Sequence, residues 1–434
     1  MLVAGTLALH RVVHGRVGLW PAAVYLFLYN HILAWGFLNY LFGVGICLLA
    51  LAGWIASERW PAWARLVLFS AVSAILFFCH LFAFGAYGLT ILAYELGRGF
   101  GRQCDPPARI ARDWAVALGQ FVLPGLLWLV SSGTTGIASG KPGLTFYGPP
   151  LAKLRALLSP ALFHWQPLDF LIFGFACAVL IICLFSRTLR LAPALRWPLA
   201  VLGLAAVAMP SWLFNIAGVD FRLPLILVCL LLAGTRVETR SREGMTVVAT
   251  VALALFAARI WTMTETWRGY DRQFAEFREA TEKIDEGARL LVARRPGTFS
   301  LNGRAVFPRA YSHLPALAVI DRSVFLPYLF TGPQQPVRSA PGYTAIDTPL
   351  ASDHDFSLER LREGADPVQA QALQGHVNDR GIKAYWAHWP RNFDYLMMLD
   401  VEEPTNPFPA LLDPVHEGSF FMLYSVNGNE AVPR

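Results

Sequence analysis

The stretch that decides the fold is residues 62–97, which read AWARLVLFSAVSAILFFCHLFAFGAYGLTILAYELG. As one helix it would be about 54 Å long, at roughly 1.5 Å per residue, whereas the hydrocarbon core of a bilayer measures about 30 Å. Two helices that turn at Cys79-His80 are short enough to cross that core. We therefore predict a transmembrane hairpin with spans at 62–79 and 81–97.

The composition of the whole chain also indicates a membrane protein. Of its 434 residues, 55% are hydrophobic and only 15% are charged, against about 25% charged in a typical soluble domain. Further apolar runs lie at 17–29, 32–56, 113–132, 169–186, 197–214, 221–236 and 244–263. Together with the hairpin they predict a helical domain over residues 1–263 with about nine spans.

Basic residues are sorted between the two sides of this predicted domain. The loops at 57–65, 97–112, 187–196 and 236–242 share one side and hold twelve arginines, whereas the other side holds Lys141, Lys153, Arg155 and Arg222. By the positive-inside rule the arginine-rich side faces the cytoplasm. This places residues 264–434 outside the cytoplasm. The arginines explain the net charge of +6, so no nucleic-acid partner is predicted.

Residues 264–434 are predicted to form a second, smaller domain. A polar helical stretch at 265–288 continues the last span, and apolar runs follow at 289–293, 316–320, 324–330, 394–401 and 420–426. Ser357 is a candidate cap for a helix over 358–375. Strands interleaved with helices indicate a small α/β domain. The expected fold is thus an α-helical polytopic membrane protein with a C-terminal extracytoplasmic α/β domain.

Charged groups beside lipid are costly, and those near the predicted outer face are therefore candidate site residues. Asp169 and Asp220 are the acids expected there, and Arg222 follows Asp220 by two positions. Asp220 and Arg222 form either an ion pair that fixes the turn at 214–221, or a site in which Arg222 binds an anionic lipid or phosphate head. In the second interpretation, Asp220 orients the arginine.

Further candidates for substrate contact lie near the same face. His31, His80 and Asn39 are near predicted outer ends of spans, and Lys153 and Arg155 fall on a predicted surface helix at 151–166. Interfacial packing is the alternative for the histidines, and helix packing for Asn39 with its neighbours Gly36, Gly43 and Gly45. The sequence has no CxxC or HExxH spacing, so neither a metal site nor a cofactor is predicted, and a requirement for a divalent cation is left open.

The block Gly36-Phe-Leu-Asn-Tyr-Leu-Phe-Gly-Val-Gly45, a histidine at an outer hairpin (His80), the segment Asp220-Phe-Arg-Leu-Pro224 and an outside tail together resemble bacterial GT-C-type membrane glycosyltransferases. They are similar in particular to the dolichyl-phosphate-mannose and aminoarabinose transferase-like proteins. The resemblance implies transfer of a sugar from a polyprenyl-phosphate donor to a lipid or glycan acceptor on the outer face of the cytoplasmic membrane. It also implies a catalytic base, Asp220 or Asp169, and phosphate binding by Arg222 with Lys153 or Arg155.

The chain departs from that family in one respect. Family members carry an essential acid in a large outer loop after the first span, whereas the first acid here is Glu58, on the predicted cytoplasmic side. We expect that an N-terminal span and this loop are missing from the chain. The alternatives are that Asp169 or Asp220 substitutes, or that the chemistry has been lost. A non-catalytic scaffold of envelope polysaccharide assembly is then the competing function, followed by a lipid or solute transporter.

Overall fold

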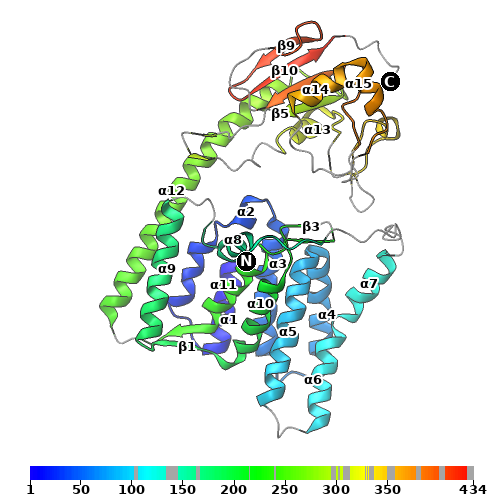
Figure 1. Ribbon diagram of the computed structural model, residues 1–434. Coiled ribbons are helices and arrows are strands. Elements are labelled where there is room, and N and C mark those ends of the chain that lie inside the picture. Colours follow the sequence, from blue (N-terminus) through cyan, green and yellow to red (C-terminus); the bar gives the residue numbers. More distant parts are fainter. Residues whose placement is uncertain are drawn as a thin grey trace. The chain divides into compact units, whose positions relative to one another are not determined.

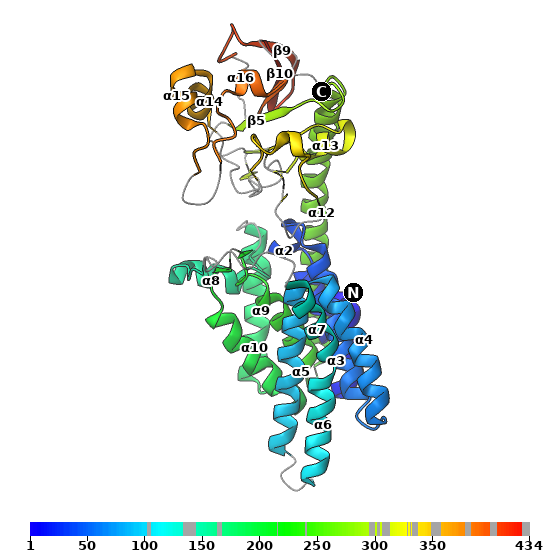
Figure 2. The same cartoon turned by 90° about the vertical axis from the view of Figure 1, so that its right-hand side faces the viewer.

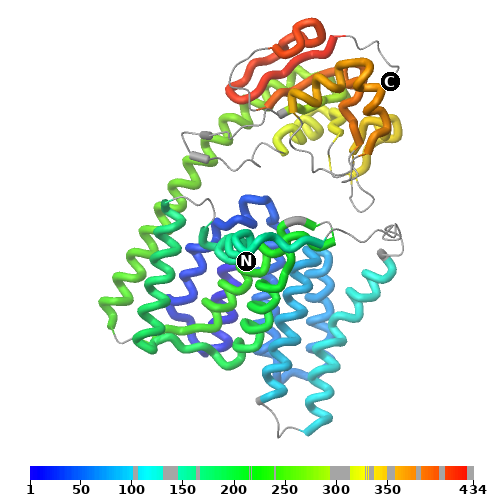
Figure 3. The backbone as a smooth tube through the Cα atoms, viewed as in Figure 1, coloured from blue at the N-terminus to red at the C-terminus, as the bar shows by residue number. Residues whose placement is uncertain are grey.

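The computed structural model describes residues 1–101, 106–132, 145–162, 167–214, 216–238, 241–294, 300–301, 304–305, 313–327, 329, 331, 337–348, 357–377, 383–399 and 406–427. The chain divides into two compact units, Met1–Trp261 and Thr262–Arg434. Each unit has a buried hydrophobic core of its own. The division falls inside one long helix, α12 (Arg242–Thr281), which Figure 3 traces as a continuous coil.

Helices build the first unit. Among the described residues, five stretches are long and apolar enough to cross a membrane: α3 (Leu38–Ala56), α4 (Ala62–Cys79), Pro107–Val130 within α6 (Pro107–Gly119) and α7 (Val122–Ser132), α9 (Pro167–Phe185) and α12. The other helices are α5 (Leu81–Gly101), which has 21 residues, and the shorter α1 (Leu2–His14), α2 (His31–Ala34), α8 (Pro150–Leu158), α10 (Arg196–Ala208), α11 (Leu223–Gly234), and the 3-10 helices η1 (Trp20–Phe27) and η3 (Pro193–Leu195). This set is compatible with a multi-pass membrane protein.

The apolar run at 62–97 is divided into two helices, as we predicted because one helix of that length would exceed the thickness of a bilayer. Helix α4 ends at Cys79, His80 is extended, and α5 begins at Leu81. His80 Nδ1 accepts a hydrogen bond from the backbone N–H of Phe82 at 3.1 Å, which satisfies one of the free donors in the first turn of α5. The predicted hairpin turn is confirmed.

Two other predicted spans are interrupted. The run at 17–29 contains a 3-10 helix, η1, of 8 residues, and because such a helix rises about 2 Å per residue it does not cross a bilayer by itself. The run at 32–56 is split into α2 and α3 around Gly36, whose φ is +76°. Asn30 begins α2 by accepting hydrogen bonds from the N–H groups of Ile32 and Leu33.

The two ends of the first unit differ in composition. Strand β1 (Leu189–Leu191) pairs antiparallel with β4 (Thr235–Val237), and Arg190 lies opposite Arg236. Figure 1 and Figure 2 show α2 and α8 at one end of the helices and the meeting of α5 with α6 at the other. In Figure 1, β1 lies at the α5–α6 end. The predicted arginine-rich loops thus gather at one end of the unit.

A mixed four-stranded sheet forms the centre of the second unit. Its order is β5 (Leu290–Arg294), β8 (Tyr395–Leu399), β10 (Phe421–Val426) and β9 (Leu412–Glu417), with β5 and β8 parallel and the other pairs antiparallel. The other elements are β6 (Ser300–Leu301), β7 (Arg304–Ala305), α13 (Ala316–Arg322), η4 (Pro341–Tyr343), α14 (Leu358–Ala365), α15 (Pro367–Leu373) and α16 (Trp389–Asn392). Arg289 and Asp394 join the starts of β5 and β8, with Nη2 and Oδ1 2.8 Å apart.

The predicted runs of the second unit have mixed outcomes. Runs 289–293, 394–401 and 420–426 contain β5, β8 and β10, and Ser357 caps α14 as expected. The run at 316–320 is helical instead, in α13, because its Ala and Leu are strong helix formers. The predicted helix over 358–375 is two helices, since the Asp366-Pro367 pair ends α14 and caps α15.

Candidate functional site

Several predicted site residues converge at one end of the first unit, where α3, α5 and α11 begin and α4 ends. Arg222 immediately precedes α11, and Tyr40 in the first turn of α3 donates a hydrogen bond from its hydroxyl to the Arg222 carbonyl at 2.7 Å. His80 lies edge-on to the Tyr40 ring, with 5.1 Å between the ring centroids. Residues separated by as many as 182 positions therefore meet at this end.

The guanidinium of Arg222 is buried without a carboxylate partner among the described residues. The residue is 4% exposed, and Cζ lies 5.0 Å from the Phe37 ring centroid and 5.4 Å from that of Phe82. Cation–π contacts stabilise the charge in part. The Nε atom is buried and has no hydrogen-bond partner in the described part of the chain. Burial of a cation without a hydrogen-bonded anion costs free energy, and binding of an anion would lower that cost.

Asp220 lies in the same turn and is only 1% exposed. Its Oδ2 accepts a hydrogen bond from Ser211 Oγ at 2.7 Å and lies 3.4 Å from Lys153 Nζ. Lys153 also donates to the carbonyl of Met209. The other carboxylate oxygen, Oδ1, is buried and without a hydrogen-bond partner among the described residues. The expected ion pair between Asp220 and Arg222 is therefore wrong, because Asp220 pairs with Lys153 of α8.

Aromatic rings extend the cluster. His31 stacks on Phe221, with ring centroids 4.7 Å apart and an interplanar angle of 25°, and lies 4.3 Å from the Trp35 ring. Because Nδ1 of His80 accepts a backbone hydrogen bond, a neutral His80 carries its proton on Nε2. His31 and His80 thus both contribute imidazole groups beside the Asp220–Arg222 turn.

The remaining predicted residues have other surroundings. Asn39 donates from Nδ2 to the carbonyl of Cys79 at 3.3 Å, which ties the start of α3 to the end of α4. Arg155 is exposed on α8. Asp169 Oδ1 lies 2.7 Å from Arg259 Nη1, and both side chains are buried, so this acid forms an ion pair between α9 and α12.

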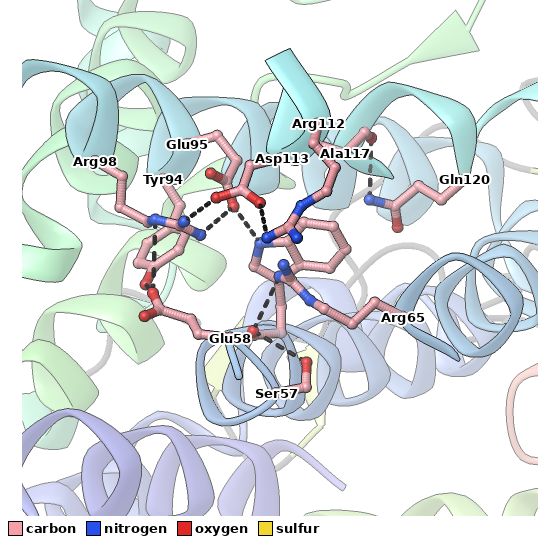
Figure 4. Close-up of polar contacts among 11 residues, drawn as sticks. Ser57, Glu58, Arg65, Tyr94, Glu95, Arg98, Arg112, Asp113, Ala117 and Gln120 are labelled. Carbon is pink, nitrogen blue, oxygen red and sulfur yellow. Dashed lines mark hydrogen bonds and ion pairs between the residues drawn. The ribbon is translucent and has the colours of Figure 1, made fainter. Parts of the chain in front are cut away.

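A second polar cluster lies at the opposite end and was not predicted as a unit (Figure 4). Arg98 is its centre, with nitrogen–oxygen distances of 2.9 Å to Glu95, 2.6 Å to Asp113 and 3.6 Å to Glu58. Trp54 Nε1 donates to Glu95 Oε1 at 2.7 Å. These contacts join residues on α3, α5 and α6 and in the connection between α3 and α4.

Two further arginines complete this cluster. Arg65 is 3% exposed, and its Cζ lies 4.0 Å over the Trp54 ring. Arg112 lies 3.4 Å from Asp113. The three acids thus face three arginines, and the described charges balance. From the sequence, these arginines were used only to predict which side of the membrane each loop faces. The acids in or beside the same loops were the sequence signal that could have predicted a network of ion pairs. The ion pairs of Arg98 with carboxylates indicate a structural role for this arginine, whereas Arg222 has no such pair among the described residues.

The described residues contain no group of three His, Cys, Asp or Glu side chains that could hold a metal ion. Comparison of the chain with protein-family models, with curated proteins and with solved structures gave no match. Among the described residues, the cluster around Arg222 and Asp220 is the candidate functional site.

Proposed function

We propose that the protein is a membrane glycosyltransferase that moves a sugar from a polyprenyl-phosphate donor to a lipid or glycan acceptor. The observation that carries this proposal is the buried Arg222, which forms no ion pair within 4.0 Å and leaves its Nε without a hydrogen-bond partner among the described residues. Beside it, Asp220 has one oxygen without a partner. An anion receptor next to an available carboxylate is the pair of groups that such a transfer needs.

In this proposal Arg222 binds the phosphate of the donor. A phosphate oxygen would satisfy the Nε–H and offset the cost of the buried charge, and charge-assisted hydrogen bonds of this kind are the strong ones. The same contact stabilises the charge that grows on the phosphate as the bond to the sugar breaks. Lys153 lies on the far side of Asp220 and contributes further positive charge.

Asp220 acts as the general base. Its Oδ1 takes the proton of the acceptor hydroxyl as that oxygen bonds to the anomeric carbon, and the lipid phosphate leaves with the electron pair of the broken bond. Ser211 and Lys153 hold Oδ2, so the orientation of Oδ1 is fixed in advance. We assign Asp169 no chemical step, because Arg259 pairs with it.

The proposal includes the orientation of the chain in the membrane. With the arginine-rich end in the cytoplasm, the cluster around Arg222 belongs to the outer face, and residues from Thr262 onward follow α12 into the periplasm. The inner membrane of a bacterium and a count of about nine crossings are parts of this proposal.

Binding of polyprenyl phosphate alone tests the anion site. In lipid nanodiscs we expect Arg222→Gln to weaken binding roughly 10- to 100-fold, as loss of about 1.5–3 kcal/mol in hydrogen bonds to a charged group requires. Arg155→Gln is the matched control because it removes an exposed arginine of α8, and it should leave affinity nearly unchanged. Equal affinity in both variants would refute the assignment.

Transfer itself is tested by the release of polyprenyl phosphate from polyprenyl-phosphate hexoses and pentoses in the presence of lipid and glycan acceptors from bacterial envelopes. Asp220→Asn should abolish release while keeping affinity for polyprenyl phosphate. A scaffold is the second candidate function, since the ion pair with Lys153 also fits a purely structural Asp220. Binding that depends on Arg222, without any release by the unaltered protein, would favour the scaffold over the enzyme.

A further inference from the structure

An exposed apolar ribbon borders the Asp220 turn. Strands β2 (Trp212–Leu213) and β3 (Ile216–Ala217) form a hairpin, and Phe146 pairs with Trp212 through two backbone hydrogen bonds of 3.0 Å. Most large side chains of the ribbon lie open: Phe146 is 51% exposed, Tyr147 63%, Phe214 69% and Ile216 50%. We call residues 146–148, 211–214 and 216–217 the aromatic ribbon.

Helix α8 is attached to this ribbon. Gly148 N–H donates to Ser211 Oγ at 3.3 Å, and Lys153 donates to the Met209 carbonyl. Two leucines of α8, Leu151 and Leu154, are 59% and 50% exposed. Lys153 and Arg155 alternate with them along the helix. A helix that exposes leucines together with an arginine has the side chains of a segment that lies in a membrane interface.

The hairpin tip carries an unfavourable residue for its backbone. Register places a two-residue loop between Leu213 and Ile216, and Phe214 in that loop has φ of +49°. Glycine, asparagine and aspartate are the residues that such hairpin positions favour, whereas a bulky side chain rarely adopts this conformation. Because Phe214 is also exposed, packing within the described protein does not explain its presence. Strain of this kind is a reason to look for a function of the side chain.

We propose that the aromatic ribbon and α8 insert into the outer leaflet at the boundary between headgroups and acyl chains. The occupant of this apolar surface is therefore the lipid bilayer. Three observations favour lipid: the ribbon follows α10, one of the shorter apolar helices of the first unit, Trp212 and Tyr147 are of the residue types that form interfacial aromatic belts, and the exposed Arg155 lies on the adjoining α8. This inference does not depend on glycosyl transfer.

Photocrosslinking of the full chain in vesicles of phosphatidylethanolamine and phosphatidylglycerol tests the insertion. Phe214→p-benzoylphenylalanine should give adducts with lipid acyl chains, detected by mass spectrometry. Val368→p-benzoylphenylalanine is the control, since Val368 on α15 of the second unit is apolar and 79% exposed. We expect several-fold more lipid adduct at position 214. Adducts from position 214 with residues 262–434, with a second copy of the chain, or with no lipid would overturn the proposal.

A second variant separates insertion from folding. Phe214→Asn removes the ring but suits the positive φ, so the fold should be retained. With the photocrosslinker at position 147, this substitution should lower the yield of lipid adduct several-fold while the melting temperature is unchanged or higher. An unchanged yield at position 147 would show that Phe214 does not anchor the ribbon in lipid and would contradict the proposal.

Discussion

A buried arginine that lacks a carboxylate partner should cost the protein stability, and Arg222 offers a direct measurement of that cost. Replacing it by methionine, of similar length and without charge, should raise the melting temperature of the detergent-solubilised protein. The expected gain is about 1–3 kcal/mol, because apolar replacement of a buried charge removes its desolvation penalty. The same Arg222→Met variant should no longer bind polyprenyl phosphate. Stability and function would then oppose each other at one residue.

Arg98→Met is the contrasting variant. It leaves Glu58, Glu95 and Asp113 without their central cation, and removal of one member of a buried charge network costs about 3–5 kcal/mol. Measured at the same scan rate, the melting temperature of Arg98→Met should fall, whereas that of Arg222→Met should rise. If both variants lose stability, then Arg222 is a structural residue and the proposed anion site is wrong.

Sequence spacing singled out the Asp220–Arg222 segment as a candidate but did not predict its contacts. Two residues in a turn can point in different directions, and here the partner of Asp220 is Lys153, 67 positions away. The cluster around Arg98 shows the same limit. Its acids and arginines come from three helices and one connection, so only packing between helices reveals that they meet.

At the scale of elements, close contact between α3 and α5 positions the site. A Cβ added at Gly43 would lie 2.8 Å from Ala83 Cβ, which is too close for carbon atoms. Gly43→Ala should therefore push α3 away from the first turn of α5, which carries Phe82. We expect a loss of about 1–3 kcal/mol in stability, as overpacking typically costs, together with weaker binding of polyprenyl phosphate.

Gly85→Ala is the matched control on α5, since no atom lies within 4 Å of its added Cβ. Alanine favours helix over glycine by about 1 kcal/mol, so the melting temperature should stay level or rise, and binding should be retained. A similar loss in both variants would contradict the packing explanation.

Only some of the glycines that we predicted to allow close packing of helices do so. Gly43 and Gly45 lie against Ala83 and Met1, but Gly36 has open space around it and a positive φ. A one-dimensional pattern does not separate a glycine needed for packing from one needed for a turn. The same holds for the run at 316–320, where hydrophobicity alone does not distinguish strand from helix.

At the scale of the whole molecule, the lengths of the apolar runs and the positions of the arginines were the sequence features that predicted the arrangement of the helices. The limit that a bilayer sets on helix length predicted the turn at Cys79-His80, and the arginine-rich connections gather at one end of the first unit. Edge strand β9 was not predicted, because Pro414 and the polar residues around it lack the alternation of a buried strand.

Fusion reporters test the orientation that the proposed function requires. Alkaline phosphatase, which is active only after export, should be active when fused after Arg434. The same enzyme fused after Arg187, in the connection between α9 and β1, should be inactive, and a fluorescent protein at that position should fluoresce. The reason is that several arginines near the ends of membrane helices hold the connections at 187–196 and 236–242 in the cytoplasm. If instead alkaline phosphatase fused after Arg434 is inactive and a fluorescent protein at that position fluoresces, the end that carries Arg222 and Asp220 also faces the cytosol. A donor presented on the outer face could not reach Arg222 in that orientation, so the result would remove both the proposed substrate and the assigned side of the aromatic ribbon, while the folded cluster itself would stand.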